Sequence, residues 1–275
     1  MRYQVSDWDD AYANAPNIPD GAAYPDRWAA AAAAFRQGHA GELDIAYGPE
    51  PRNRIDLFPP AGEVRGLAVF IHGGFWLRFD KSWWSHLAAG GIARGWAVAL
   101  PSYTLAPAAS VDEIVAEVAQ AIEAAAARVP GPIRLTGHSV GGHLAARMIA
   151  APSPLAATTL ARVAHVVSIS GVHDLRPLLR TAMNEKLGLT AATARAASPA
   201  LLDPVAGKSL TAWVGGAERA EFRRQNALLA NIWRGCNART LAVEEPDRHH
   251  FNVIEGLSDP NSPLMRELLR AETAP

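Results

Sequence analysis

The chain has 275 residues, of which 49% are hydrophobic and 19% are charged, and its formal net charge is -1. These values are typical of one or two globular domains, and they argue against a disordered chain or a basic nucleic-acid-binding surface. The chain has one cysteine, Cys236, and its first ten residues contain no apolar signal segment. No apolar run approaches the ~20 residues of a membrane span. The sequence therefore predicts a cytoplasmic protein without a membrane partner.

The N-terminal part of the chain combines a surface arm with a first helix and a hairpin. Residues 1–28 are rich in Asp, Asn, Pro and aromatic residues and show no sustained periodicity. The Ala-rich segment 29–36 predicts a short helix that ends near Gly38, because alanine has the highest helix propensity. Residues 43–47 and 54–58 alternate apolar and polar side chains between Gly and Pro residues, and this pattern predicts an edge hairpin.

The rest of the chain alternates buried strands with helices. Strands are predicted at 67–71, 96–100, 133–136, 163–169, 210–214 and 240–243. Helices are predicted at 82–94, at 110–128, from the turn that follows the 133–136 strand to about 150, at 220–234 and at 263–270. This alternation predicts an α/β protein with a mainly parallel sheet and helices on both faces. We expect one domain over 1–275, with residues 1–38 as an N-terminal arm and helix, and residues 171–205, which hold three prolines, as a cap or lid insertion over the sheet.

The strand at 133–136 leads directly into the sequence Gly137-His138-Ser139-Val140-Gly141 and then into a helical pattern. A strand, a sharp turn and a helix around G-x-S-x-G form the nucleophile elbow of the α/β-hydrolase fold, in which the serine hydroxyl stands above the sheet. The two glycines suit this turn because a side chain there would collide with the facing backbone. The pattern predicts Ser139 as a nucleophile.

A serine nucleophile needs a base that takes its proton and an acid that orients the base. In this fold the acid and the histidine follow the serine on loops after later strands. The loop after 210–214 offers Glu218 first, with Glu221 as the alternative, more typical of the first turn of a helix. The loop after 240–243 holds the adjacent His249 and His250, and the apolar Phe251 favours His250 weakly.

Acyl transfer also needs backbone N–H groups that stabilise the oxyanion. Val140, the residue after the serine, supplies one donor, and the loop after the 67–71 strand supplies another from Gly73 or Gly74. The aromatic residues that follow these glycines predict a substrate pocket for a small molecule with an aromatic or apolar group. Its expected members are Phe75, Trp76, Trp84, Tyr103 and His138. No metal site is expected, because His138 and His143 do not share a helix face and no Cys or acidic cluster accompanies them.

Together, these motifs resemble the kynurenine formamidase (arylformamidase) branch of the α/β-hydrolases, which is related to the hormone-sensitive-lipase-like esterases. The resemblance rests on the 72–76 and 137–143 motifs and extends through 170–175, 196–199, 221–225 and 250–254. It implies Ser139 as the nucleophile, Glu218 as the acid and His250 rather than His249 as the base. Two positions depart from the family pattern: the acid is a glutamate where the animal members have aspartate, and Phe75 stands where tyrosine is common.

The resemblance implies a serine hydrolase of tryptophan catabolism that converts N-formylkynurenine to kynurenine and formate, without a metal or organic cofactor. A carboxylesterase for small acyl esters would use the same triad and is the nearest alternative. A non-catalytic hydrolase fold that binds a ligand is a remote alternative, since such proteins usually lose a triad member. The sequence leaves both a monomer and a homodimer open.

Overall fold

The computed structural model describes residues 4–271, and their strands form one eight-stranded sheet in the order β1-β2-β4-β3-β5-β6-β7-β8. The β1–β2 and β2–β4 pairs are antiparallel, and the five pairs from β4 to β8 are parallel. The strands are β1 (Glu42–Ala46), β2 (Arg54–Phe58), β3 (Leu67–Ile71), β4 (Ala97–Pro101), β5 (Ile133–His138), β6 (Val163–Ile169), β7 (Ser209–Gly215) and β8 (Arg239–Glu245). The predicted mainly parallel α/β sheet is confirmed.

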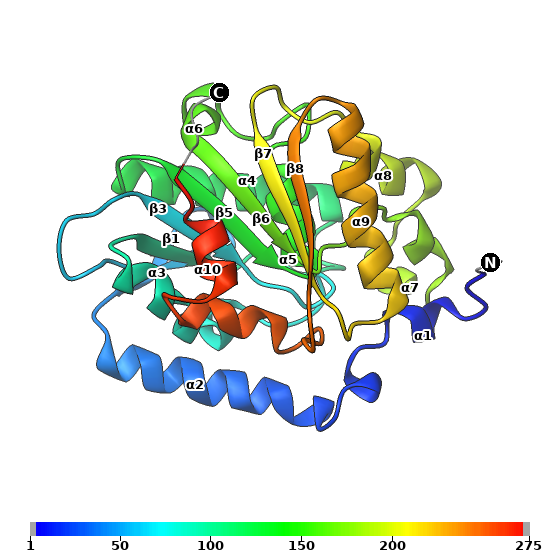
Figure 1. Cartoon of the computed structure of the whole chain (residues 1–275), viewed down its shortest axis with the longest axis horizontal. Coiled ribbons are helices and arrows are strands. Elements are labelled where there is room, and N and C mark those ends of the chain that lie inside the picture. Colours follow the sequence, from blue (N-terminus) through cyan, green and yellow to red (C-terminus); the bar gives the residue numbers. More distant parts are fainter. Residues whose placement is uncertain (1–3, 272–275) are drawn as a thin grey trace.

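Helices cover both faces of this sheet, with α2 and α10 on one side and α9 on the other (Figure 1). The α-helices are α1 (Trp8–Tyr12), α2 (Tyr24–Gly38), α3 (Ala89–Ala93), α4 (Val111–Arg128), α5 (Val140–Arg147), α6 (Ala157–Arg162), α7 (Asn184–Leu187), α8 (Ala191–Ala196), α9 (Ala220–Gly235) and α10 (Pro263–Leu268). Within residues 4–271, none of the helices has the length and apolar character needed to cross a bilayer.

Strand β3 shows why both faces are covered. Its side chains alternate, so that Leu67, Val69 and Ile71 pack in the core with α4, α5 and α9, while Ala68 and Phe70 pack in the core with α2 and α10. All five residues are buried. A strand that is apolar at every position therefore reflects two cores, one on each face of the sheet.

The parallel register brings the ends of the central strands to one edge. Ile71 at the end of β3 pairs with Gly137 of β5, and His138 pairs with Ile169 at the end of β6. Further along, Gly215 at the end of β7 pairs with Glu245 at the end of β8. The loops that carry the predicted functional residues follow these ends, so the topology gathers them at the carboxyl edge of the sheet.

Several elements differ from the prediction. The helix expected at 82–94 is two 3₁₀ turns, Lys81–Trp83 and Ser85–Ala88, followed by α3. Gly90 and Gly91 lower the helix propensity of this segment, and Asp80 caps a 3₁₀ turn by accepting a hydrogen bond from the Ser82 amide. Helix α2 begins at Tyr24 rather than near residue 29, because Pro25 suits a helix start and the segment packs against these 3₁₀ turns.

The segment 171–205 lies between β6 and β7 and contains only short pieces: 3₁₀ turns at Arg176–Arg180 and Pro199–Leu201, and helices α7 and α8. It packs against α5 and α9 through the Pro199–Leu201 turn, on the side where Figure 1 shows α7, α8 and α9 together.

Candidate active site

Ser139 stands at the turn between β5 and α5 with φ 57° and ψ -122°. A serine rarely adopts this left-handed region, so the turn carries backbone strain that the surroundings must hold. The two glycines allow the close approach: a Cβ at Gly137 would lie 2.1 Å from the Gly141 carbonyl oxygen, and one at Gly141 would lie 2.0 Å from that of Ile71. This local geometry matches the elbow expected from the sequence.

The loop after β3 lies against this turn. A Cβ on Gly73 would be 3.1 Å from the Ser139 Cβ, and Gly74 has φ +114°, which favours glycine. Within residues 4–271, neither the Gly73 nor the Gly74 amide donates a hydrogen bond to the protein. The amide of Val140 is the first of α5 and has no acceptor within its own helix. The three candidate oxyanion donors, the amides of Gly73, Gly74 and Val140, thus lie in the two segments that meet at Ser139.

Glu218 and His250 form a buried pair. Nδ1 of His250 lies 2.6 Å from Oε2 of Glu218, and the two side chains are 4% and 0% exposed. The other carboxylate oxygen, Oε1, accepts the hydroxyl of Ser170 at 2.5 Å and the amide of Gly215 at 2.8 Å. These donors fix the carboxylate, which in turn holds the proton on Nδ1 of the imidazole and leaves Nε2 as the basic nitrogen.

Backbone contacts hold the loops that carry this pair. The amide of Gly216 donates to the Glu245 carbonyl at 2.7 Å, and that of Ala217 donates to the Arg248 carbonyl at 2.9 Å. The loop after β7 is thus tied to the loop after β8.

Among the hydrogen bonds formed between described residues, none joins Ser139 Oγ to His250. Catalytic hydrogen bonds of this kind often shorten only when substrate binds.

His138 contacts the backbone of His250. Its Nε2 lies 2.8 Å from the His250 carbonyl oxygen, and the two rings lie 4.6 Å apart between centroids. Burial and the adjacent His250 lower the pKa of His138 well below its usual value. The ring is therefore neutral and donates its Nε2 proton, which makes it a support for the turn rather than a second base.

Ser139 and His250 line one pocket of about 480 Å³. Three of the five predicted pocket residues, Phe75, Trp84 and His138, line it as well. Trp76 and Tyr103 do not, and this part of the prediction is corrected. Trp76 is fully buried and its ring packs edge-on against His143, and Tyr103 is also fully buried and donates its hydroxyl to the His72 carbonyl at 3.0 Å.

The N-terminal arm forms a large part of the pocket wall, which the sequence analysis did not anticipate. Segments 9–28 contribute Tyr12, Asn14 and Trp28 among others, while the segment 171–205 contributes only Met183. The arm, more than the proposed cap, encloses Ser139. Its unusual content of aromatic residues was the available signal, but no local periodicity linked those residues to the site.

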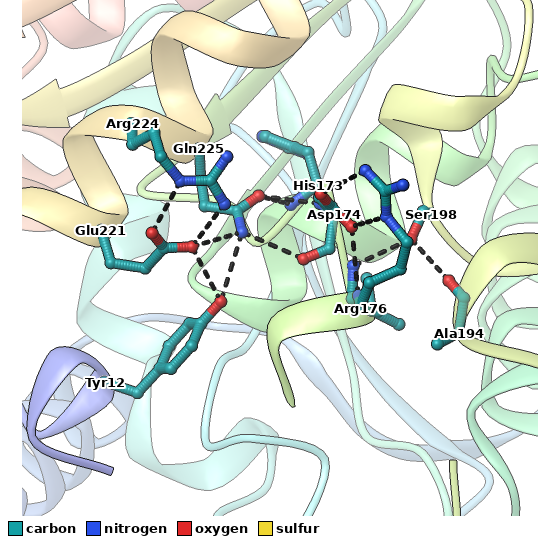
Figure 2. Close-up of polar contacts among 10 residues, drawn as sticks. Tyr12, His173, Asp174, Arg176, Ala194, Ser198, Glu221, Arg224 and Gln225 are labelled. Atoms are coloured by element: carbon teal, nitrogen blue, oxygen red, sulfur yellow. Dashed lines mark hydrogen bonds and ion pairs between the residues drawn. The ribbon is translucent and has the colours of Figure 1, made fainter. Parts of the chain in front are cut away.

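Glu221, the alternative acid, belongs to a different network (Figure 2). It lies on the first turn of α9, is 1% exposed and accepts the Tyr12 hydroxyl at 3.0 Å and the Gln225 side chain at 2.8 Å. Arg224 donates to both of its oxygens at 2.7 Å. None of the hydrogen bonds of Glu221 between described residues is to His250, so the structure pairs the histidine with Glu218 and not with Glu221.

The other histidines occupy packing positions. His72 directs Nδ1 to the Gly73 carbonyl at 2.8 Å, and His165 lies buried beside Ser209 and Glu267. His249 contacts the Tyr24 hydroxyl through Nε2 at 3.1 Å. In the part of the chain that the structure describes, no cluster of His, Cys, Asp or Glu is placed to hold a metal ion.

Comparison with known proteins identifies the family of this chain. Residues 68–274 match the model of the alpha/beta hydrolase family, so the chain belongs to that family and is a hydrolase. It is similar to the kynurenine formamidase of Danio rerio, with 27% identity over 238 residues that cover 83% of this chain and 80% of that protein. The resemblance to kynurenine formamidase-like α/β-hydrolases is confirmed.

Two further matches are to a methylesterase and to a protein proposed to be a thioesterase. Isoprenylcysteine alpha-carbonyl methylesterase of Arabidopsis thaliana is 33% identical over 110 residues, 37% of this chain and 26% of that protein. A crystal structure from Silicibacter sp. TM1040, of a protein proposed to be a thioesterase, has a TM-score of 0.90 and 48% identity and covers 94% of this chain and 98% of that chain.

Proposed function

We propose that this chain is a serine hydrolase that removes the formyl group of N-formyl aryl amines, with N-formylkynurenine as the substrate and kynurenine and formate as products. The observation that carries the proposal is the buried Glu218–His250 pair, which shares a pocket with Ser139 on its strained turn. The similarity to kynurenine formamidase over most of the chain supports the choice of substrate. With that substrate the reaction is a step of tryptophan catabolism.

The reaction begins when Ser139 Oγ attacks the formyl carbonyl carbon while His250 Nε2 takes the hydroxyl proton. Glu218 holds the Nδ1 proton and stabilises the imidazolium that forms. The amides of Val140 and of Gly73 or Gly74 donate to the oxyanion of the tetrahedral intermediate, and each such donor typically contributes ~3 kcal/mol of transition-state stabilisation.

The intermediate collapses when the C–N bond breaks and His250 gives its proton to the departing arylamine nitrogen. A water molecule then attacks the formyl-enzyme, again with His250 as base. The ester bond to Ser139 breaks, formate leaves and the serine hydroxyl regains its proton. Every proton in the cycle passes through one imidazole, so no metal or organic cofactor is needed.

An esterase is the second candidate. The matches to a methylesterase and to a protein proposed to be a thioesterase favour it, because an acyl ester would use the same nucleophile and base. An ester also has a better leaving group than an amide, so ester hydrolysis alone is a less demanding reaction. The two candidates differ in whether the site can protonate and expel an arylamine.

The test is the kcat/KM of the wild-type protein for N-formylkynurenine and for p-nitrophenyl acetate, with Ser139→Ala as the control. We expect the formamide to react above ~10⁴ M⁻¹s⁻¹, an ordinary enzyme efficiency. The variant should lose activity on both compounds and also its labelling by a fluorophosphonate. Hydrolysis of the ester alone would leave the serine mechanism in place and reject the formamidase.

A further inference from the structure

The pocket that contains Ser139 holds two formal charges in otherwise neutral surroundings. Of the described residues that line it, only Asp9 and Arg78 are acidic or basic besides the histidines. Much of the remaining wall is aromatic, formed by Tyr12, Trp28, Phe75, Phe79, Trp84 and Phe251. A pocket built for an uncharged aromatic molecule has no need of one cation and one anion on its wall.

Arg78 lies on the loop that follows the predicted oxyanion glycines. It is exposed, and its guanidinium lies 5.1 Å from the centroid of the Phe79 ring, which lines the same pocket. Among residues 4–271 no carboxylate lies within ion-pair distance of this guanidinium. The ring holds the cation beside the pocket by a cation–π contact and leaves its N–H groups available for a carboxylate.

Asp9 lies on α1 and lines the same pocket as Arg78. Its Oδ1 accepts the Ala182 amide at 2.8 Å, so one carboxylate oxygen is held by the protein and the side chain remains exposed. Helix α1 is fixed by the bond of Tyr12 to Glu221, shown in Figure 2, and by the ion pair of Asp10 with Arg219. The contacts of α1 and of the Ala182 amide therefore hold the Asp9 carboxylate in a fixed place on the pocket wall.

We propose that Arg78 and Asp9 recognise the amino-acid end of the substrate, with Arg78 binding its α-carboxylate and Asp9 its α-ammonium group. This inference rests on the proposed formamidase function and assigns two residues that select its substrate. They favour aryl formamides that carry a zwitterionic α-amino acid group over formamides that lack it. The formamide lies toward Ser139, the aryl ring against the aromatic wall, and the two charges of the substrate at Arg78 and Asp9.

The experiment compares N-formylkynurenine with o-formamidoacetophenone, which keeps the aryl ketone and the formamide but lacks the amino-acid group. The quantity measured is the kcat/KM for N-formylkynurenine divided by the kcat/KM for o-formamidoacetophenone. Arg78→Gln should lower this ratio at least roughly tenfold, mainly through KM, because it removes a charge-assisted hydrogen bond to the carboxylate; tenfold corresponds to about 1.4 kcal/mol. Arg78→Lys, which keeps the charge, should recover part of the loss.

Two further variants sharpen the result. Asp9→Asn keeps an oxygen for the Ala182 amide but removes the charge, and it should also lower the ratio. Arg180→Gln is the matched control, because Arg180 is an exposed arginine that also lies over an aromatic ring, that of Trp8 at 5.9 Å, yet does not line the pocket. It should leave the ratio as in the wild type.

The outcomes separate this inference from the function on which it rests. If the wild type hydrolyses both formamides and Arg78→Gln changes both kcat/KM values equally, the formamidase stands and the zwitterion site is wrong. If the wild type hydrolyses p-nitrophenyl acetate but neither formamide, the proposed function fails, and the inference fails with it.

Discussion

Glu218 and Glu221 lie three residues apart but have different hydrogen-bond partners. Glu218 follows the last residue of β7 by a short turn and reaches His250, whereas Glu221 faces Tyr12 and Arg224 from the first turn of α9. The sequence favours Glu218 by its position in the loop, but it does not show the contacts that separate the two glutamates. The difference arises from the helix start between them, which turns the second side chain away.

Glu218→Gln should lower kcat for N-formylkynurenine by ~10³–10⁴-fold, the order found when the acid of a serine triad becomes an amide. Ser170 and Gly215 both donate to Oε1, so the amide oxygen must take that position and the amide NH₂ must face His250. An NH₂ donor opposite Nδ1 stabilises the wrong imidazole tautomer. The measurement is steady-state kinetics of purified protein at neutral pH.

The matched control is Glu221→Gln, which neutralises the other glutamate. It should keep kcat near the wild-type value while lowering stability, since it weakens a buried network. A large loss of kcat in Glu221→Gln with little change in Glu218→Gln would exchange the two roles and contradict the assignment.

At the scale of elements, the sequence predicted those features that local chemistry determines. The buried strands have apolar runs, the elbow needs glycines, and the apolar side chains of α4 recur at helical spacing, so each could be located in advance. The N-terminal arm could not, because α1 has only five residues and its place depends on contacts with α9, more than 200 residues away. Such tertiary contacts leave no periodic signal in the local sequence.

The attachment of α1 to α9 depends on the Tyr12 hydroxyl, which is buried, donates to Glu221 and accepts from Gln225 at 3.2 Å. Burial and the Glu221 charge raise the pKa of Tyr12, so the hydroxyl stays protonated. Tyr12→Phe should lower the free energy of unfolding by about 1.5–3 kcal/mol, as expected for a lost hydrogen bond to a charged group. Urea denaturation of the variant and the wild type measures this change.

A double-mutant cycle tests whether the effect belongs to this contact. Tyr12→Phe, Glu221→Gln and the double variant should give a coupling free energy of about 1 kcal/mol or more, as neighbours in one hydrogen-bond network do. Additive effects would instead mean that Tyr12 stabilises the arm by its ring alone, through its edge-on contact with Phe222. In that case α1 would be held by packing.

At the scale of the whole molecule, the fold buries histidines that play no part in the proposed chemistry. Burial lowers the pKa of His72 to about 4 and the pKa values of His143 and His173 to about 3. Two of the three pack behind the elbow: His143 bonds the Ala197 carbonyl, and His173 bonds Ser168 next to Gly142. His143 joins α5 to the 171–205 segment, and His173 joins that segment to β6, both as neutral hydrogen-bonding groups.

This burial couples the stability of the protein to pH. An unfolded histidine has a pKa of ~6.5, so between pH ~6.5 and ~3 the unfolded chain binds protons that the folded chain excludes. The free energy of unfolding therefore falls as the pH is lowered through 6.5. Each histidine of this kind contributes a slope of about 1.4 kcal/mol per pH unit well below 6.5, in addition to the contribution of the carboxylates.

His173→Gln should reduce this slope by about 1.4 kcal/mol per pH unit between pH ~4.5 and ~6, because glutamine does not titrate. The variant will be less stable at neutral pH if the bond to Ser168 is weakened, so the slope and not the absolute stability is the test. Urea denaturation at a series of pH values gives both. An unchanged slope would mean that His173 takes up its proton in the folded state, and that the region behind the elbow is open to water rather than closed by the packing of α5 against the 171–205 segment.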